Sequence, residues 1–191
     1  MKSDNNQKLA VLLPVYNGEE TIFRTVTSLL NQTYKNFIIY VCDDGSKDKS
    51  VDIIKRLESN RIKIFKNKIN QGLAYAMNKL VANVEKSSKY IAFAEQDDYY
   101  YPYRFGKQIS YLNENEHVGL VSGIADHWDG KKIKRQTPGI LVNGGSYPSG
   151  YEFFKYNYRE QIKVVNSCIM LRKEIHLNLS LIHISEPTRP Y

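Results

Sequence analysis

The acidic residues Glu95, Asp97 and Asp98 directly follow a short apolar run, residues 90–94. The β-branched and aromatic residues of this run indicate a buried strand. Carboxylates are costly to bury without partners, so we expect the acids at the strand's end. In open α/β sheets the carboxyl ends of the strands face the ligand crevice, and clustered carboxylates there suit a hard cation that carries a phosphorylated ligand. Taken alone, the run is equally compatible with a solvated acidic turn.

Two earlier apolar runs end in polar clusters of the same kind. Residues 8–13 lead into Pro14-Val-Tyr-Asn17, and residues 37–42 lead into Asp43-Asp-Gly-Ser46. If these runs are parallel strands, their carboxyl ends meet at one edge of a sheet. Each cluster alone is a common turn sequence. Three clusters at successive strand ends favour a ligand site over three unrelated turns.

The elements that must position these clusters alternate regularly along the chain. Strand-like runs occupy residues 8–13, 37–42, 61–65 and 90–94. Helical spacing of apolar residues predicts helices over residues 19–32, from 48, over 73–84 and from 102 onward. Such βα alternation predicts an α/β fold, a mostly parallel nucleotide-binding sheet flanked by helices.

After His117 the alternation stops. We expect a strand over residues 118–124, a hairpin or long loop over 126–150, a short helix over 151–156 and a strand over 164–171. No linker divides the chain, so residues 1–178 are predicted to form a single domain. The last stretch, residues 179–191, resembles translated sequencing-adapter read-through and is left out of the fold. On that interpretation the natural domain continues past Asn178 and is incomplete here.

Bulk composition narrows the function classes. The chain has 191 residues and a net charge of +7, but its lysines are dispersed and no nucleic-acid-binding signature accompanies them, so no nucleic-acid partner is expected. No apolar run is long enough to cross a bilayer, and the first eight residues do not form a signal peptide, so we expect a cytoplasmic protein. Cys42 and Cys168 lie in apolar runs without metal-ligand spacing and are predicted to be buried, reduced thiols.

Several motifs together resemble the N-terminal part of family 2 glycosyltransferases with the GT-A fold. They occur in the family's order and cover roughly residues 8–124. They are Pro14-Val-Tyr-Asn17, Ser28-Leu-Leu-Asn-Gln-Thr33, Asp43-Asp-Gly-Ser-Lys-Asp48, Asn70-Gln-Gly-Leu-Ala-Tyr-Ala-Met-Asn78 and Glu95-Gln-Asp-Asp98. The resemblance implies transfer of a sugar from a nucleotide diphospho-sugar to a saccharide or lipid-linked acceptor, with inversion and with Mg2+ or Mn2+. It also implies a place in cell-surface polysaccharide biosynthesis, with peripheral contact at the inner face of the cell membrane.

The resemblance also implies roles for individual residues, carried over by position. The donor-binding residues it implies are Pro14, Tyr16, Glu19, Asp43, Asp44, Asn70, Gly72, Asn78 and Asp97. Among them, Asp44 or Asp43 matches the acid that hydrogen-bonds the base. Asp97 and Asp98 match the metal-binding acids, with Asp98 the better match for direct ligation. Glu95 stands where many relatives have the first Asp of Asp-x-Asp-Asp.

Two points of chemistry remain open at this level. Side chains alternate along a strand, so Asp97 and Asp98 point to opposite sides unless the chain bends, and one of them can instead hold the ribose or a metal-bound water. Inverting transfer needs a base for the acceptor hydroxyl. In the family this base lies in a later acidic motif that does not follow here, so the catalytic residue is unknown.

Other functions compete with the leading one. A truncated, catalytically inactive domain that binds a nucleotide diphosphate is the main alternative. A nucleotidyltransferase typically shows a Gly-rich basic phosphate loop, and a dinucleotide-binding oxidoreductase shows Gly-x-Gly-x-x-Gly after the first strand; neither is present. The segment Asp126-His-Trp128 is compatible with an acceptor pocket or an ordinary loop. Lys131-Lys-Ile-Lys-Arg135 is compatible with contact to acidic lipid or with an exposed hairpin.

Overall fold

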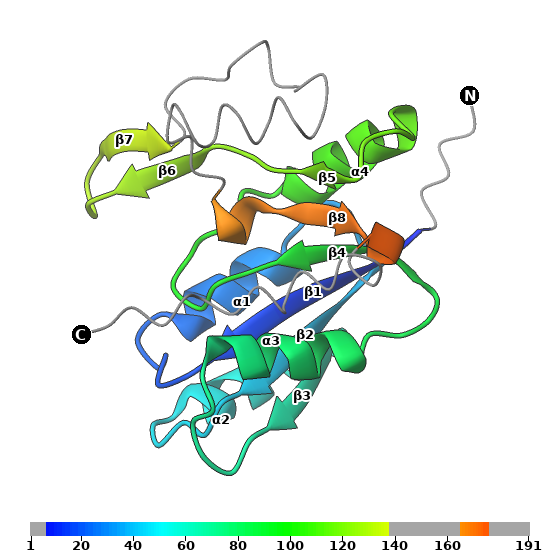
Figure 1. Cartoon of the computed structure of the whole chain (residues 1–191). Helices are drawn as coiled ribbons and strands as arrows, with labels where there is room; N and C mark the ends of the chain where they lie inside the picture. Colours follow the sequence, from blue (N-terminus) through cyan, green and yellow to red (C-terminus); the bar gives the residue numbers. More distant parts are fainter. Residues whose placement is uncertain (1–6, 138–164, 176–191) are drawn as a thin grey trace, which may run out of the picture.

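The computed structural model describes residues 7–137 and 165–175, which form a three-layer α/β arrangement (Figure 1). The parallel strands of the main sheet are β1 (Lys8–Val15), β2 (Phe37–Asp43), β3 (Ile62–Lys66) and β4 (Ser88–Phe93). Two short strands, β5 (Leu120–Val121) and β8 (Met170–Arg172), complete the sheet in the order β3-β2-β1-β4-β8-β5. Strand β8 is antiparallel to both of its neighbours. The sheet is therefore mostly parallel, as the sequence predicts.

The helices α1 to α4 and a small hairpin surround this sheet. The helices are α1 (Ile22–Leu30), α2 (Ser50–Lys55), α3 (Leu73–Ala82) and α4 (Arg104–Glu114). A separate two-stranded hairpin consists of β6 (Ala125–Trp128) and β7 (Ile133–Thr137). A turn of 3-10 helix, η2 (Asn166–Cys168), leads into β8.

Apolar side chains cover both faces of the sheet. Val11 and Val41 pack with α1, α2 and α4 on one face. Leu12 and Tyr40 pack with α3 on the other face, and Figure 1 shows α3 on the opposite side of the sheet from α1. Because both faces are buried, β1 has an almost unbroken apolar sequence instead of an alternating one. This double burial fixes where each strand ends, and so fixes the loops that follow.

The first four strands and helices are confirmed, with shifted boundaries. The helix expected from residue 19 begins at Ile22, and the helix expected from residue 48 begins at Ser50, whose backbone N–H is accepted by the Asp48 side chain at 3.0 Å. Strand β1 does not stop at Pro14 but continues to Val15. Pro14 lacks an N–H, and it is tolerated because pairing of β1 with β4 has already ended at Leu12.

Two later predictions are corrected. The strand expected over residues 118–124 comprises only Leu120–Val121, because its partner β8 is three residues long and pairs with it through Met170 and Leu171. The strand expected over 164–171 is divided into η2 and β8. The hairpin expected after residue 126 is present as β6 and β7. The remainder of that loop, the short helix at 151–156 and the tail at 179–191 lie outside the described residues.

The two thiols differ in exposure. Cys42 is buried and Cys168 is half-buried, and both are free. Burial raises the pKa of Cys42 to about 11, so this thiol is unreactive at neutral pH. Among the residues that the structure describes, no helix combines the length and apolarity needed to span a bilayer.

Candidate functional site

The carboxyl ends of β1, β2 and β4 meet at one edge of the sheet, as expected from their parallel pairing. Strand β1 lies between the other two, and Val15 pairs with Asp43. The Val15 carbonyl accepts a hydrogen bond from the Asp44 N–H at 2.8 Å, and the Leu12 carbonyl accepts one from the Ala94 N–H at 2.9 Å. The loops that leave these strands are therefore adjacent from their first residues.

The loop after β1 and the loop after β2 are joined by reciprocal hydrogen bonds. The Asn17 N–H donates to Ser46 Oγ at 3.0 Å. The Glu19 N–H donates to Asp48 Oδ2 at 2.9 Å, and Glu19 Oε2 accepts from the Lys49 N–H at 3.0 Å. Glu19, predicted to bind the donor, thus also braces this pair of loops through one carboxylate oxygen.

Gln96 joins the loop after β1 to the acidic segment after β4. Its Oε1 accepts from the Tyr16 N–H at 2.8 Å, and its Nε2 donates to the Tyr16 carbonyl at 3.1 Å. Gly18 lies against the same side chain, where an added Cβ would be 2.7 Å from Gln96 Oε1. The Tyr16 backbone is fixed in this way, while the residue as a whole remains 41% exposed. Sequence reasoning assigned no role to Gln96.

Asp43 and Asp44 have different surroundings, although both are buried. Asp44 accepts from Asn67 Nδ2 at 2.7 Å, from the Gln71 N–H at 3.0 Å and from the Gly72 N–H at 2.8 Å. Both of its oxygens are engaged, which uses most of the lone pairs of a carboxylate. Asp43 accepts the Ser46 N–H through Oδ1 at 3.0 Å. Asp44 therefore fastens the loop before α3, and Asp43 retains more accepting capacity.

The other predicted site residues, most of them near α3, differ in whether they hold the loops together or are exposed to solvent. Gly72 adopts φ 88° at the helix start, and its N–H is shared between Asp44 and Asn70 Oδ1, the latter at 2.9 Å. Asn70 is exposed apart from that contact, and Asn78 is exposed on α3. Pro14 is half-buried within β1. Of these residues, the structure brings Asn70 and Gly72 to Asp44.

The acidic segment is bound along its backbone by α1. Thr25 Oγ1 lies 2.8 Å from the carbonyl oxygens of both Gln96 and Asp98, which share its single hydroxyl proton. Arg24 Nη2 donates to the Asp97 carbonyl at 2.7 Å. Because the carbonyls face α1, the segment turns sharply, and the Asp98 N–H approaches the Glu95 carbonyl at 3.4 Å. The bend removes strict strand alternation: Asp97 is exposed and Asp98 is half-buried.

Residues at the end of α1 also bind the segment that follows the acids. Ser28 Oγ accepts from the Tyr100 N–H at 3.1 Å. Gln32 is fully buried; its Nε2 donates to the Tyr101 carbonyl at 2.7 Å, and its Oε1 accepts from the Phe105 N–H at 3.1 Å. These contacts explain the Ser28-Leu-Leu-Asn-Gln-Thr33 motif, for which sequence reasoning had no physical role. The motif holds the segment that leads from the acids into α4.

The negative charges of Asp98 and its neighbouring acids are partly balanced by the nearby Arg104 guanidinium. The Arg104 guanidinium donates to the Phe93 carbonyl at 3.0 Å and lies 4.8 Å from the centre of the Tyr100 ring. Burial lowers the pKa of Arg104, while nearby groups that include Asp98 raise it. Burial raises the pKa of Glu95, and the charges of Asp98 and Asp97 raise it further. A second cation beside these acids would relieve the same repulsion.

The carboxylates of Asp97 and Asp98 suit a cation whose remaining coordination positions are filled by a phosphate ligand and water. Within residues 7–137 and 165–175, neither carboxylate receives a hydrogen bond, and no three His, Cys, Asp or Glu side chains converge into a cage. Mg2+ and Mn2+ sites commonly use one or two carboxylates together with substrate phosphates and water. The donor set therefore fits a cation that arrives with a diphosphate.

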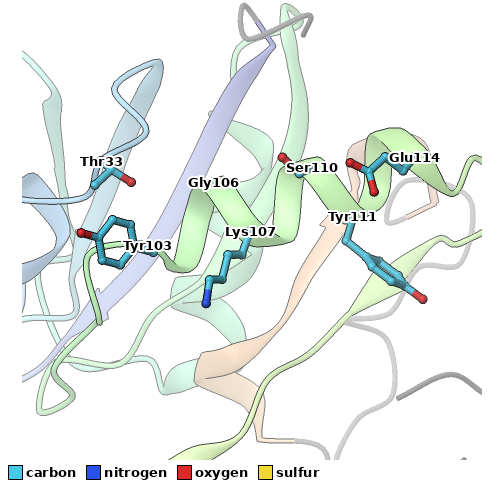
Figure 2. A pocket seen from close by; sticks show the side chains of 7 residues that line it. All are labelled: Thr33, Tyr103, Gly106, Lys107, Ser110, Tyr111 and Glu114. Atoms are coloured by element: carbon cyan, nitrogen blue, oxygen red, sulfur yellow. The ribbon is translucent and has the colours of Figure 1, made fainter. Parts of the chain in front are cut away.

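A groove of about 450 Å³ lies elsewhere, along the outer side of α4. Figure 2 shows Tyr103 and Thr33 at one end and Tyr111 with Glu114 at the other. None of the predicted site residues lines it. The candidate site is the edge formed by the strand ends, and this groove is not part of it.

Gly45 is a sensitive point of the loop after β2, and it supports a stability prediction. It has φ 78°, and an added Cβ would lie 2.7 Å from the Ile69 carbonyl carbon and 2.8 Å from the Asn70 nitrogen. Both atoms belong to the backbone, so Gly45→Ala must displace the loop held by Asp44. We expect the free energy of unfolding to fall by about 2–3 kcal/mol in urea titration.

The matched control for this prediction is Gly130→Ala. Gly130 also has a positive φ, 94°, but nothing lies within 4 Å of its added Cβ. Only backbone strain applies there, and we expect a loss of about 1 kcal/mol. Equal losses for the two variants would contradict the proposed close approach of the two loops.

Comparison with known proteins agrees with this architecture, a mostly parallel α/β sheet with acids and polar loops at the strand ends. Residues 1–349 of TarS from S. aureus, solved in complex with UDP, match with a TM-score of 0.71 over 95% of this chain and 52% of that chain, at 17% identity. A mannosyltransferase from Pyrobaculum calidifontis, PcManGT, solved with GDP-Man and Mn2+, matches with a TM-score of 0.64 over 90% and 46%, at 15% identity. These likenesses confirm the predicted fold class, that of GT-A glycosyltransferases.

The sequence model of glycosyl transferase family 2 matches residues 10–179, so the chain belongs to glycosyl transferase family 2. A curated relative is the UDP-Glc:alpha-D-GlcNAc-diphosphoundecaprenol beta-1,3-glucosyltransferase WfaP of Escherichia coli, 39% identical over 58% of this chain and 43% of WfaP. The chain spans less than half the length of that relative and about half of the TarS fragment. The family resemblance seen in the motifs is thus confirmed.

Proposed function

We propose that this chain is the donor-binding domain of a glycosyltransferase that moves a sugar from a nucleotide diphospho-sugar to a saccharide or lipid-linked acceptor, with inversion. The observation that carries the proposal is the convergence of Asp43, Tyr16 and Asp98 on one sheet edge, each held by contacts from a different loop or helix. Family membership supports the reaction class. We place the domain within residues 1–178.

In this proposal Asp98, Asp97 and Asp43 have different roles in binding the donor. Asp98 would hold Mg2+ or Mn2+ directly, and Asp97 would contribute an outer contact to the ribose or to a metal-bound water. A cation held there would supply positive charge against the negative charge of the departing nucleoside diphosphate. Asp43 accepts a hydrogen bond from the base, because Asp44 is already engaged by the loop before α3.

The remaining donor-binding residues shape the pocket around the nucleotide. Tyr16 is an exposed residue whose ring can pack against the base, and Pro14 lies two residues before it in β1. Glu19, Asn70 and Gly72 hold the loops that form the walls. Asn78 is exposed on α3, and no hydrogen bond among the described residues joins it to the loops of the site.

The chemical class of the acceptor can also be proposed. WfaP, by its name, acts on a sugar linked to diphosphoundecaprenol. We infer an acceptor of the same chemical class, a saccharide on a lipid diphosphate. The protein then works from the cytoplasm at the inner face of the cell membrane, in cell-surface polysaccharide biosynthesis.

A second candidate function is a domain that binds the nucleotide diphosphate without transferring a sugar. It is favoured by the distribution of acids: in residues 165–175, the described part after β7, the single acid is the exposed Glu174. No described side chain is therefore assigned as the base for the acceptor hydroxyl, and the catalytic residue remains unassigned.

Calorimetric titration tests the proposal. UDP and GDP are titrated into the protein with Mn2+, with Mg2+ and with EDTA. We expect binding of one nucleotide that weakens at least about tenfold without metal. Absence of metal-dependent binding for both nucleotides would contradict the donor site. Binding without sugar transfer to a diphosphoundecaprenol-linked saccharide would favour the second candidate.

A further inference from the structure

The tip of the hairpin β6–β7 carries an exposed apolar pair. Trp128 and Ile133 are paired across the two strands, so their side chains lie on the same face. Trp128 is 60% exposed and Ile133 is 50% exposed. Contiguous exposed apolar side chains rimmed by polar residues mark surfaces that contact a protein or a membrane.

Lysines surround this pair. Lys131 and Lys132 form the turn between the strands, and both are exposed. Neither has an ion pair within the residues that the structure describes, whereas Lys134 is paired with Asp129 at 3.0 Å. Asp129 Oδ1 also accepts the N–H groups of Lys131 and Lys132, both at 2.9 Å. The turn is therefore held by its backbone, and the two ammonium groups are left for an external anion.

The hairpin is attached to the segment that carries Asp98. Tyr101 donates its hydroxyl hydrogen bond to Asp126 Oδ2 at 2.9 Å, and Gln136 Nε2 donates to Asp126 Oδ1 at 2.6 Å. Tyr101 follows Asp98 by three residues. In Figure 1 the hairpin projects beyond the β8–β5 side of the sheet, away from α3. Its tip is thus a projecting surface with a fixed connection to the candidate site.

We propose that the hairpin tip, defined as Trp128, Lys131, Lys132 and Ile133, binds the surface of an anionic lipid bilayer. The apolar pair enters the boundary between headgroups and acyl chains, where tryptophan is favoured. The two lysines face lipid phosphates, which attract basic residues near the surface. Lipid binding of this kind assigns a specific surface to the membrane location given in the proposed function, and it is tested separately because it does not require sugar transfer.

The chemistry of the tip favours lipid over a saccharide stacked on Trp128. A sugar site combines an aromatic ring with acids or amides that bind hydroxyl groups. The nearby acids are already engaged: Asp126 by Tyr101 and Gln136, and Asp129 by the turn and Lys134. A second apolar side chain and two cations without ion pairs remain, and these match an anionic interface.

The chain contains a single tryptophan, so Trp128 itself reports on binding. The experiment records its fluorescence with vesicles of phosphatidylcholine alone and of phosphatidylcholine mixed with phosphatidylglycerol. We expect a blue shift, and quenching by brominated acyl chains, with the anionic vesicles only. In vesicle sedimentation, K131A/K132A should lower partitioning about 30-fold. I133S should also lower partitioning, because apolar burial is lost.

Matched controls separate this effect from general charge and from folding. K55A/K107A removes two exposed cations on α2 and α4 and should leave partitioning within about threefold. K131A/K132A keeps the backbone N–H groups bound to Asp129, and its circular dichroism and its calorimetric titration with UDP and GDP should match those of the unmodified protein. The vesicle result therefore stands or fails independently of donor binding.

Three outcomes would overturn the proposal. The first is an unchanged Trp128 spectrum with anionic vesicles. The second is equal loss of partitioning in K131A/K132A and K55A/K107A, which would indicate a diffuse charge effect. The third is a blue shift with a soluble saccharide and none with vesicles, which would assign the tip to sugar binding.

Discussion

Replacing Asp98 by asparagine is expected to lower the affinity for the bound nucleotide diphosphate in the presence of Mn2+ by about 100-fold. The amide is nearly isosteric but carries no charge, so the proposed metal site loses its direct anionic ligand. The Asp98 carboxylate accepts no hydrogen bond from the described residues, and its backbone carbonyl, bound by Thr25, is unchanged. The free energy of unfolding should therefore change by less than about 1 kcal/mol.

The control is Asp97→Asn. Asp97 is exposed, and its backbone carbonyl is held by Arg24 in the same way that Thr25 holds that of Asp98. We expect about a tenfold loss of affinity from an outer contact. Calorimetric titration with Mn2+ and with EDTA measures both variants. If Asp97→Asn proves the more damaging change, the two roles are reversed.

Replacing Asp44 by alanine is expected to destabilise the protein by about 3 kcal/mol. The substitution removes the acceptor for Asn67, Gln71 and Gly72 at a buried position. Hydrogen bonds to a charged group are among the stronger ones, and buried N–H groups left without acceptors add a desolvation cost. Urea titration followed by circular dichroism gives the change in unfolding free energy.

Asp43→Asn provides the contrasting variant. The amide oxygen can still accept the Ser46 N–H, so stability should fall by about 1 kcal/mol at most. The affinity for the nucleotide should fall about tenfold or more, because the proposed acceptor for the base loses its charge. A large loss of binding for an Asp44 variant that remains folded, with none for Asp43→Asn, would return the base contact to Asp44.

Much of the fold could be read from local patterns. Apolar runs of strand length, helical spacing between them and acids at their ends depend on neighbouring residues only, so residues 8–112 were assigned correctly in order and type. Boundaries were less accurate where a side chain and not periodicity decides them, as where Asp48 binds the backbone at the start of α2. The strands β5 and β8 are predicted, but over too many residues, because their length depends on each other's pairing.

The sequence motifs predict a set of candidate site residues, but not how roles divide among them. The motifs identified Asp43, Asp44, Asp97 and Asp98, and family membership is confirmed. The binding roles of these residues remain proposals. Nothing in the local sequence distinguishes Asp43 from Asp44, since the donors that engage Asp44 come from a loop more than twenty residues away. The same is true of Gln96, whose partner Tyr16 is eighty residues distant in sequence.

The sequence by itself determined that acids and polar loops follow parallel strands, because strand composition and the cost of burying carboxylates are local properties. The tertiary structure alone decided that Asp44 is engaged by the loop before α3 while Asp43 keeps more accepting capacity. It also decided that the acidic segment bends against α1, which makes Asp97 exposed and Asp98 half-buried. These outcomes depend on hydrogen bonds between distant segments, and such bonds exist only once the sheet has brought its strand ends together.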